Sequence, residues 1–208
     1  MSCDITETKW VVPAEEPATE PVRLRRGTAD DADALALVGA ATFLEAFTWM
    51  LPGEDILAHC TKNHSAESYR AALAKPETRI TLAVTANGGA PVGYAMLTAP
   101  DLPTFPLEPG DIELKRIYLL SRFRSRRGAP VLDDAGTPQA ELSAGQALMN
   151  AAIADAQAMH FKRLLLGTHE NNQRAIAFYR RNGFAEAGTR TFQVGSQCCC
   201  DLIFARPL

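Results

Sequence analysis

Residues 167–184 read GTHENNQRAIAFYRRNGF, and this stretch is the clearest structural signal in the chain. The side chain of Asn172 can cap the start of a helix that runs through Tyr179 to Asn182. Gly183 then supplies the residue type that commonly ends a helix. We therefore expect a short helix with well-defined ends directly after residue 171.

The elements on both sides of this helix predict one mixed α/β domain. A short apolar strand, 163–168, precedes it, and a helix with one apolar face, 144–160, precedes that strand. The pattern predicts further helices over 28–47, 55–61 and 65–73, and further strands over 22–26, 78–85, 91–99, 112–120, 190–194 and 198–205. Asn87-Gly88-Gly89 predicts a tight turn inside a hairpin.

The composition excludes several classes of protein. Of the 208 residues, 47% are hydrophobic and 22% are charged, ordinary values that exclude global disorder, collagen and coiled coil. The net charge of -3 argues against general binding of nucleic acid or anionic membranes. No apolar run approaches the roughly 18–20 residues of a membrane span. We expect no nucleic-acid partner and no membrane partner.

The first 21 residues differ from the rest in their charge. They combine three prolines with the acids Asp4, Glu7, Glu15, Glu16 and Glu20. They have neither the basic start nor the apolar stretch of a signal peptide. We expect a mobile acidic tail over 1–21, a single domain over 22–208, and a cytoplasmic location.

Metal binding through cysteine is not expected. The five cysteines show no C-x-x-C spacing. Cys198, Cys199 and Cys200 are adjacent, and neighbours on a strand point to opposite faces, so the three cannot converge on one ion. We expect them to be small strand residues in a reducing compartment.

A candidate phosphate site lies where the helix over 144–160 begins. A helix N-terminus offers unpaired N–H groups and partial positive charge, and the small residues at 143–145 and 147 let a diphosphate approach. The preceding segment, 121–142, is long for a connection and lacks periodicity. Its four arginines either contact phosphates or form a solvated face: Arg122, Arg124, Arg126 and Arg127.

Three segments together resemble the GNAT superfamily of N-acetyltransferases. Residues 172–184 match its acetyl-CoA helix, 113–119 its central strand, and 145–149 the helix after its pyrophosphate loop. Within the superfamily, the chain is most similar to bacterial PaiA-type polyamine (spermidine/spermine) acetyltransferases, on Thr42-Phe43-x-x-x-Phe47, the strand over 112–118 and the last hairpin. The resemblance covers about residues 22–208.

The resemblance implies an α/β (α+β) fold, the GNAT fold. Its central sheet is mixed, mostly antiparallel, splayed at a bulge in the fourth strand, and flanked by helices. The family loop usually reads Gln/Arg-x-x-Gly-x-Gly/Ala, where this chain has Ala140, Ser143 and Gly145 after a loop insertion at about 126–141. A serine at position 143 suits the loop if its φ is negative, because a positive φ strains Ser but not Gly.

The resemblance also implies acetyl-CoA as co-substrate and no metal. The backbone N–H groups of Ile117 and Leu119 are expected to hold the pantetheine and the thioester oxygen, and Asn172 the cofactor arm. The other implied cofactor contacts are Tyr118, Arg124, Ser143, Ala144, Gly145, Gln146, Ala147 and Tyr179.

Acetyl transfer to an amine needs a proton donor for the thiolate and a base for the amine. Tyr179 is the candidate acid, since a phenol pKa near 10 lies only modestly above a thiol pKa near 8.5. An alkylammonium group has a pKa of about 10.4, so a base is needed. Glu113 is the candidate base, and the alternative for it is an ion pair with Lys115. His169 and His160 are alternative proton carriers.

The acceptor is implied to be a primary amine on a polyamine, a small molecule or amino acid, or a peptide N-terminus. Phe43, Glu45 and Phe47 are the candidates for binding it, with Glu45 attracting the cationic amine. A homodimer is one candidate assembly. We expect direct attack in a ternary complex, since no cysteine lies in the two motifs. A non-catalytic acyl-CoA-binding or regulatory module, and an interaction protein that uses the 126–141 insertion, stay open as alternatives.

Overall fold

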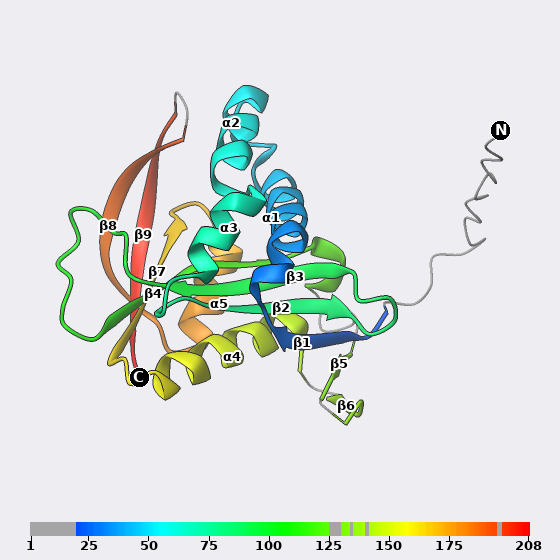
Figure 1. Ribbon diagram of the computed structural model, residues 1–208. Helices are drawn as coiled ribbons and strands as arrows, with labels where there is room; N and C mark the ends of the chain where they lie inside the picture. Colours follow the sequence, from blue (N-terminus) through cyan, green and yellow to red (C-terminus); the bar gives the residue numbers. More distant parts are fainter. Residues whose placement is uncertain (1–19, 125–129, 134, 140–141, 195–196) are drawn as a thin grey trace, which may run out of the picture.

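The computed structural model describes residues 20–124, 130–133, 135–139, 142–194 and 197–208 (Figure 1). Most of the predicted 1–21 tail and parts of the 126–141 insertion, Ala140 included, therefore lie outside the described residues. The helices are α1 (Ala32–Phe47), α2 (Gly53–Asn63), α3 (Ala66–Leu73), α4 (Ala144–Ala158) and α5 (Gln173–Arg181). The strands are β1 (Val22–Arg26), β2 (Arg79–Thr85), β3 (Pro91–Thr98), β4 (Asp111–Leu119), β5 (Val131–Leu132), β6 (Pro138–Gln139), β7 (Arg163–His169), β8 (Ala185–Val194) and β9 (Gln197–Pro207).

The described strands form one sheet in the order β6-β5-β1-β2-β3-β4-β7-β9-β8. Neighbours run antiparallel except at β1–β5 and β4–β7, which are parallel. The predicted fold class, a mixed and mostly antiparallel sheet flanked by helices, is confirmed. No helix among the described residues is long and apolar enough to cross a bilayer.

Two hydrophobic clusters pack on opposite faces of this sheet. Helices α1 and α3 cover one face, where Leu35 and Tyr69 pack on Leu82 and Tyr94. Helices α4 and α5 cover the other face (Figure 1). The sheet therefore separates the α1–α3 layer from the α4–α5 layer.

Strands β4 and β7 part after three residues. Their pairing covers only 111–113 of β4 and 163–165 of β7. The pairing of β4 with β3 shifts between Met96–Arg116 and Leu97–Leu114, so Lys115 is an extra residue and forms a bulge. The predicted splay at a bulge in the fourth strand is confirmed.

The helix ends follow from the residues that the sequence places there. Asn172, Ser143 and Ser65 each accept a hydrogen bond from the backbone N–H three residues later, at 3.2, 3.2 and 3.1 Å. Gly183 ends α5 with a φ of 80°, which a residue with a side chain rarely adopts. Ser143 has a φ of -76°, so replacing the family glycine by serine introduces no strain here.

Two predictions about strands need correction. Strand β8 begins at Ala185, five residues before the predicted start at Arg190, because its pairing with β9 overrides the weak strand propensity of Ala-Glu-Ala-Gly-Thr. The long connection contains the short strands β5 and β6, and β5 extends the sheet by pairing with Val22 and Arg23. Pairing with an existing edge, rather than periodicity, creates these strands.

Candidate active site

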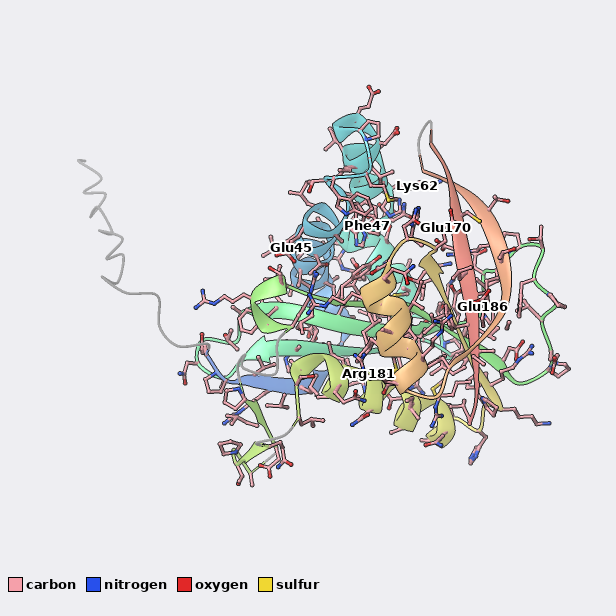
Figure 2. All side chains as sticks on the ribbon, turned by 180° about the vertical axis from the view of Figure 1, so that it is seen from behind. Glu45, Phe47, Lys62, Glu170, Arg181 and Glu186 are labelled. Atoms are coloured by element: carbon pink, nitrogen blue, oxygen red, sulfur yellow. The ribbon has the colours of Figure 1, made fainter. Side chains whose placement is uncertain are left out.

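A cavity of about 1150 Å³ opens where β4 and β7 diverge. Helices α1 and α2 form one wall, and the start of α4 and most of α5 form the other. In Figure 2, Phe47 and Lys62 mark the α1–α2 side, and Arg181 marks the far end of α5. The predicted site residues that line it are Phe43, Glu45, Phe47, Ile117, Tyr118, Leu119, Arg124, Ser143, Gly145, Gln146, Asn172 and Tyr179.

The backbone of β4 presents two N–H groups to this cavity. The N–H of Leu120 binds the carbonyl of Val92 at 2.9 Å, as expected when Leu119 and Gly93 form a non-hydrogen-bonded pair. Ile117 is in the same phase as Leu119, so both N–H groups point away from β3 and into the gap beside β7. Tyr118 is out of phase, and its N–H faces Tyr94 of β3, so only its side chain is left for a ligand.

Some backbone N–H groups at the start of α4 are available to bind a ligand. The Ser143 side chain accepts the N–H of Gln146, and the Ser143 carbonyl accepts the N–H of Ala147 at 2.9 Å. Among the described residues, no acceptor binds the N–H of Ala144 or Gly145. A Cβ at Gly145 would meet no atom within 4 Å, so this turn faces open space. The side chains of Ala144 and Ala147 are buried and do not line the cavity.

Tyr179 brings a buried phenol to the same place. Its ring packs against Phe184 and Phe204, with centroids 6.1 and 6.2 Å away, and the residue is 8% exposed. Burial, followed by the nearby Tyr118 and Asp201, raises the pKa of Tyr179 well above its usual value. Within the described part of the chain, its hydroxyl has no hydrogen-bond partner. The phenol therefore keeps its proton at neutral pH and can donate a hydrogen bond to a ligand. Its raised pKa widens the gap to a thiol pKa near 8.5, so transfer of the proton to a thiolate is more uphill than from a free phenol.

Glu45 and Arg124 bind each other across the cavity mouth. Nη2 of Arg124 lies 2.8 Å from the Glu45 carboxylate, which also accepts the N–H of Ser121 at 2.9 Å and its hydroxyl at 2.7 Å. Nε of Arg124 donates to the carbonyl of Leu119. Burial lowers the pKa of Arg124. Glu45, predicted to attract the amine, is thus already neutralised by Arg124.

Glu113 does not line the cavity. It is 1% exposed, accepts the backbone N–H of Asp101 at 2.9 Å, and lies 3.5 Å from Nζ of Lys115. Burial raises the pKa of the Glu113 carboxyl, and Lys115 opposes this shift. The geometry agrees with the alternative that we gave for Glu113, an ion pair with Lys115.

A second buried ion pair and a histidine lie on the β7–β9 wall. Arg190 Nη2 is 3.0 Å from Asp201 Oδ2, and both residues line the cavity. His169 lies opposite Asp201 in the β7–β9 register, and its Nδ1 accepts the N–H of Asn171 at 3.2 Å. Nε2 of His169 is therefore the nitrogen left for a proton transfer. His160, the other predicted carrier, is exposed and lies outside the cavity lining.

A polar cluster that the sequence did not predict lies on the α1–α3 side of the cavity. Its members are contributed by α2, α3, β3 and β4: His59, His64, Tyr69, Tyr94 and Arg116. Tyr69 links the cluster, since its hydroxyl lies 2.8 Å from Nδ1 of His64 and 2.7 Å from the Tyr94 hydroxyl. The two-residue spacing of Arg116 and Tyr118 was the available signal, because it places both on one face of β4.

The described residues contain no group of three or more His, Cys, Asp or Glu that could hold a metal ion. Cys60 and Cys200 are partly buried thiols without a disulfide. The side chains of Cys198 and Cys199 lie outside what the structure describes. The chemistry of the cavity, as described, is that of backbone donors, a phenol and ion pairs.

Comparison with known proteins agrees with this geometry. The Acetyltransferase (GNAT) family model matches residues 142–184, from the cap of α4 through α5. Uncharacterized N-acetyltransferases of Mycobacterium tuberculosis and Mycobacterium bovis are 34% identical over 178 residues, 86% of this chain and 98% of theirs. The fold and these relatives define an N-acetyltransferase. The chain belongs to the GNAT acetyltransferase family.

Solved structures share the fold at low sequence identity. A PaiA N-acetyltransferase from Thermoplasma acidophilum, crystallised with coenzyme A, has a TM-score of 0.66 and 16% identity, covering 90% of this chain and 99% of its own. A GCN5-related N-acetyltransferase from Rhodopseudomonas palustris has a TM-score of 0.63 and 16% identity, covering 93% and 100%. At such identity the likeness extends to the fold alone.

Proposed function

We propose that this N-acetyltransferase moves the acetyl group of acetyl-CoA to the nitrogen of a primary amine by direct attack in a ternary complex. One observation carries the proposal. The cavity-facing N–H groups of Ile117 and Leu119 and the unpartnered phenol of Tyr179 line one cavity that reaches both faces of the sheet. A thioester and an amine can therefore meet between them.

The α4–α5 wall suits the co-substrate. In this proposal, the N–H groups of Ala144 and Gly145, which bind no acceptor among the described residues, hold the pyrophosphate at the helix N-terminus. Arg174 lines the cavity and adds positive charge for phosphates, whereas Glu45 already balances the charge of Arg124, which lines the same cavity. Asn172 lines it from the cap of α5 and, in this proposal, binds the pantetheine arm.

The transfer forms one bond and breaks one bond. The lone pair of the neutral amine forms the C–N bond, and the carbonyl oxygen takes up negative charge. The N–H groups of Ile117 and Leu119 stabilise that charge, and loss of such a donor costs about 2.7–4 kcal/mol in other enzymes. The C–S bond then breaks, and the sulfur takes the proton of the Tyr179 hydroxyl. A base takes the ammonium proton before the attack, and the second proton that the nitrogen loses on forming the amide restores the Tyr179 hydroxyl.

We propose Glu113 as that base, acting through a water molecule, because Glu113 itself does not line the cavity. His169 is the alternative, with Nε2 as the accepting atom. The variants Glu113→Gln and His169→Gln distinguish them. The one that removes the base should lower kcat and abolish the acidic limb of its pH profile.

The candidate acceptors are a polyamine, a small amine or amino acid, and a peptide N-terminus. The PaiA neighbour supports the first only through the fold. A homodimer, a cytoplasmic location and a single domain over 22–208 stay predictions from the sequence.

The experiment is calorimetry with acetyl-CoA, followed by a thiol-release assay over a panel of amines. We expect acetyl-CoA to bind and thiol release to depend on the amine. Binding without release for every amine would favour a non-catalytic acyl-CoA-binding module. Absence of binding by the folded protein would overturn the proposal.

A further inference from the structure

Arg116, at the end of the cavity opposite α4 and α5, has no counter-ion among the residues that the structure describes. It is partly buried and lines the cavity from β4, just after the bulge. Its guanidinium carbon lies 5.3 Å from the centre of the Tyr69 ring, and Nη1 lies 4.0 Å from the sulfur of Met96. No carboxylate in the described part of the chain pairs with it.

The groups around Arg116 do not neutralise its charge. Burial first, and Arg116 second, lower the pKa of His59 to about 4 and that of His64 to about 3. Burial raises the pKa of the Tyr69 and Tyr94 phenols. All four neighbours are therefore uncharged near pH 7, and the guanidinium charge is uncompensated.

The acids elsewhere in the cavity are already paired. Each of the three has a cation at ion-pair distance: Glu45 with Arg124 at 2.8 Å, Asp101 with Lys115 at 3.1 Å, and Asp201 with Arg190 at 3.0 Å. Arg116 and Lys62 line the acceptor side without any acid partner among the described residues. A polycation that enters here would meet positive charge, and every carboxylate among the described lining residues already has a cation partner.

We propose that the acceptor carries a carboxylate as well as its amine, and that Arg116 binds this carboxylate. The inference rests on the proposed acetyl transfer to an amine. A half-buried guanidinium loses hydration and gains most from a planar, bidentate anion. Lys62, on the α2 rim of the same cavity, adds attraction for an anion as it enters (Figure 2).

The side chains that line the cavity beside Arg116 indicate the chemistry of the acceptor between its amine and its carboxylate. Phe43 stacks on His59 with ring centres 4.1 Å apart and an angle of 10°, and Phe47 packs on Phe43 at 4.4 Å. This surface is apolar and aromatic. The acceptor class is therefore an amino acid, or a short amino carboxylate, with an apolar body.

A matched set of acceptors tests this assignment. Phenylalanine, phenylalaninamide and phenethylamine share one apolar body and one primary amine, and only the first has a carboxylate. Spermidine represents the polyamines. With saturating acetyl-CoA, we expect kcat/KM for phenylalanine to exceed that of the other three by about ten- to hundredfold, the range of a charge-assisted hydrogen bond.

The variants separate a binding role from a structural one. Arg116→Gln should lower kcat/KM for phenylalanine by about ten- to hundredfold and leave phenethylamine and the KM for acetyl-CoA unchanged. Arg116→Lys should restore part of the loss, since it keeps the charge. Arg70→Gln is the control, because Arg70 is an exposed arginine of α3 outside the cavity lining.

The outcomes keep this inference apart from the proposed function. Equal or faster acetylation of phenethylamine or spermidine overturns the carboxylate assignment and leaves the amine acetyltransferase intact. An equal loss for all acceptors in Arg116→Gln, with no rescue by lysine, also overturns it. Acetyl-CoA binding without acetylation of any amine overturns the proposed function itself.

Discussion

The guanidinium of Arg190 and the carboxylate of Asp201 meet directly against the Cα of Gly167. Nη2 lies 3.0 Å from Oδ2, and the two side chains are only 15% and 6% exposed. A Cβ at Gly167 would lie 3.0 Å from that nitrogen and 3.2 Å from that oxygen. The glycine of β7 therefore leaves the space in which the pair of β8 and β9 is buried.

Asp201→Asn is expected to destabilise the fold by about 3–5 kcal/mol, because it removes the charge of one partner of a buried ion pair. Urea unfolding measures the change. Asp33→Asn is the matched control, since Asp33 is 85% exposed and its pair with Arg70 is loose at 3.8 Å, so it should cost under about 0.5 kcal/mol. Equal effects of the two substitutions would show that burial does not set the strength of the Arg190–Asp201 pair.

Acid should destabilise the protein through His59 and His64. Burial lowers their native pKa values to about 4 and about 3, below an unfolded value near 6.5. The unfolded state therefore binds more protons below pH 6.5, so stability falls as the pH drops from there toward 4. Each histidine contributes a slope of up to about 1.4 kcal/mol per pH unit in that window.

Unfolding free energies of the native chain and of His64→Gln, measured from pH 4.5 to 7.5, check this prediction. The slope should be shallower in the variant. The value at pH 7.5, where both states of His64 are neutral, gives the packing cost of the substitution alone. Parallel curves would mean that His64 is protonated in the native state.

Much of the fold could be predicted because local chemistry and tertiary packing agree. Asn172 and Ser143 are good helix caps, Gly183 has the positive φ of a helix stop, and Asn87-Gly88-Gly89 turns with φ values of 79° and 67° at its glycines. The start of β8 and the strands β5 and β6 could not be predicted in the same way. Their residues are strands because a partner strand is available, and that partner is distant in the sequence.

The residues that line the cavity from α5 could be predicted from the sequence, whereas the cluster around Arg116 could not. Tyr179 and Asn172 lie on one helix, so their spacing alone places them together. Arg116 obtains its surroundings from Tyr69 and Tyr94, which belong to other elements. The bulge at Lys115 also breaks the alternation of side chains between the two faces of β4. Leu114 packs in the α4 cluster, whereas Arg116, two residues later, lies over Tyr69 on the opposite face.

Tyr179→Phe should lower kcat by about a hundredfold or more and leave the acetyl-CoA Kd unchanged, because it removes only the proton that the thiolate needs. Since burial keeps the phenol protonated, the pH profile should show no limb from Tyr179 below about pH 10. Tyr118→Phe is the informative comparison, since burial also raises its pKa, to about 12, and both hydroxyls lack a partner among the described residues. A large loss in that variant alone would make Tyr118 the acid.

Gly145→Asp tests where the phosphates bind. The substitution places a carboxylate in the second position of α4, where a Cβ would meet no atom within 4 Å. An acid in the first turn of a helix stabilises it by about 0.3–1 kcal/mol, so the melting temperature should hold or rise. The same carboxylate faces the N–H groups proposed to bind the pyrophosphate. Its charge should raise the acetyl-CoA Kd by about a hundredfold or more, since like charges in contact cost several kcal/mol.

Gly53→Asp is the matched control for this charge. Gly53 is the first residue of α2, has the same open surroundings, and lies outside the cavity lining. Both variants add one acid to one helix N-terminus, so they change the net charge equally. Any difference between their acetyl-CoA Kd values therefore comes from where the acid lies. An unchanged Kd in Gly145→Asp would remove the start of α4 from the binding site. A weakened Kd in both variants would instead indicate that the net charge of the protein, and not a contact with the phosphates, governs affinity.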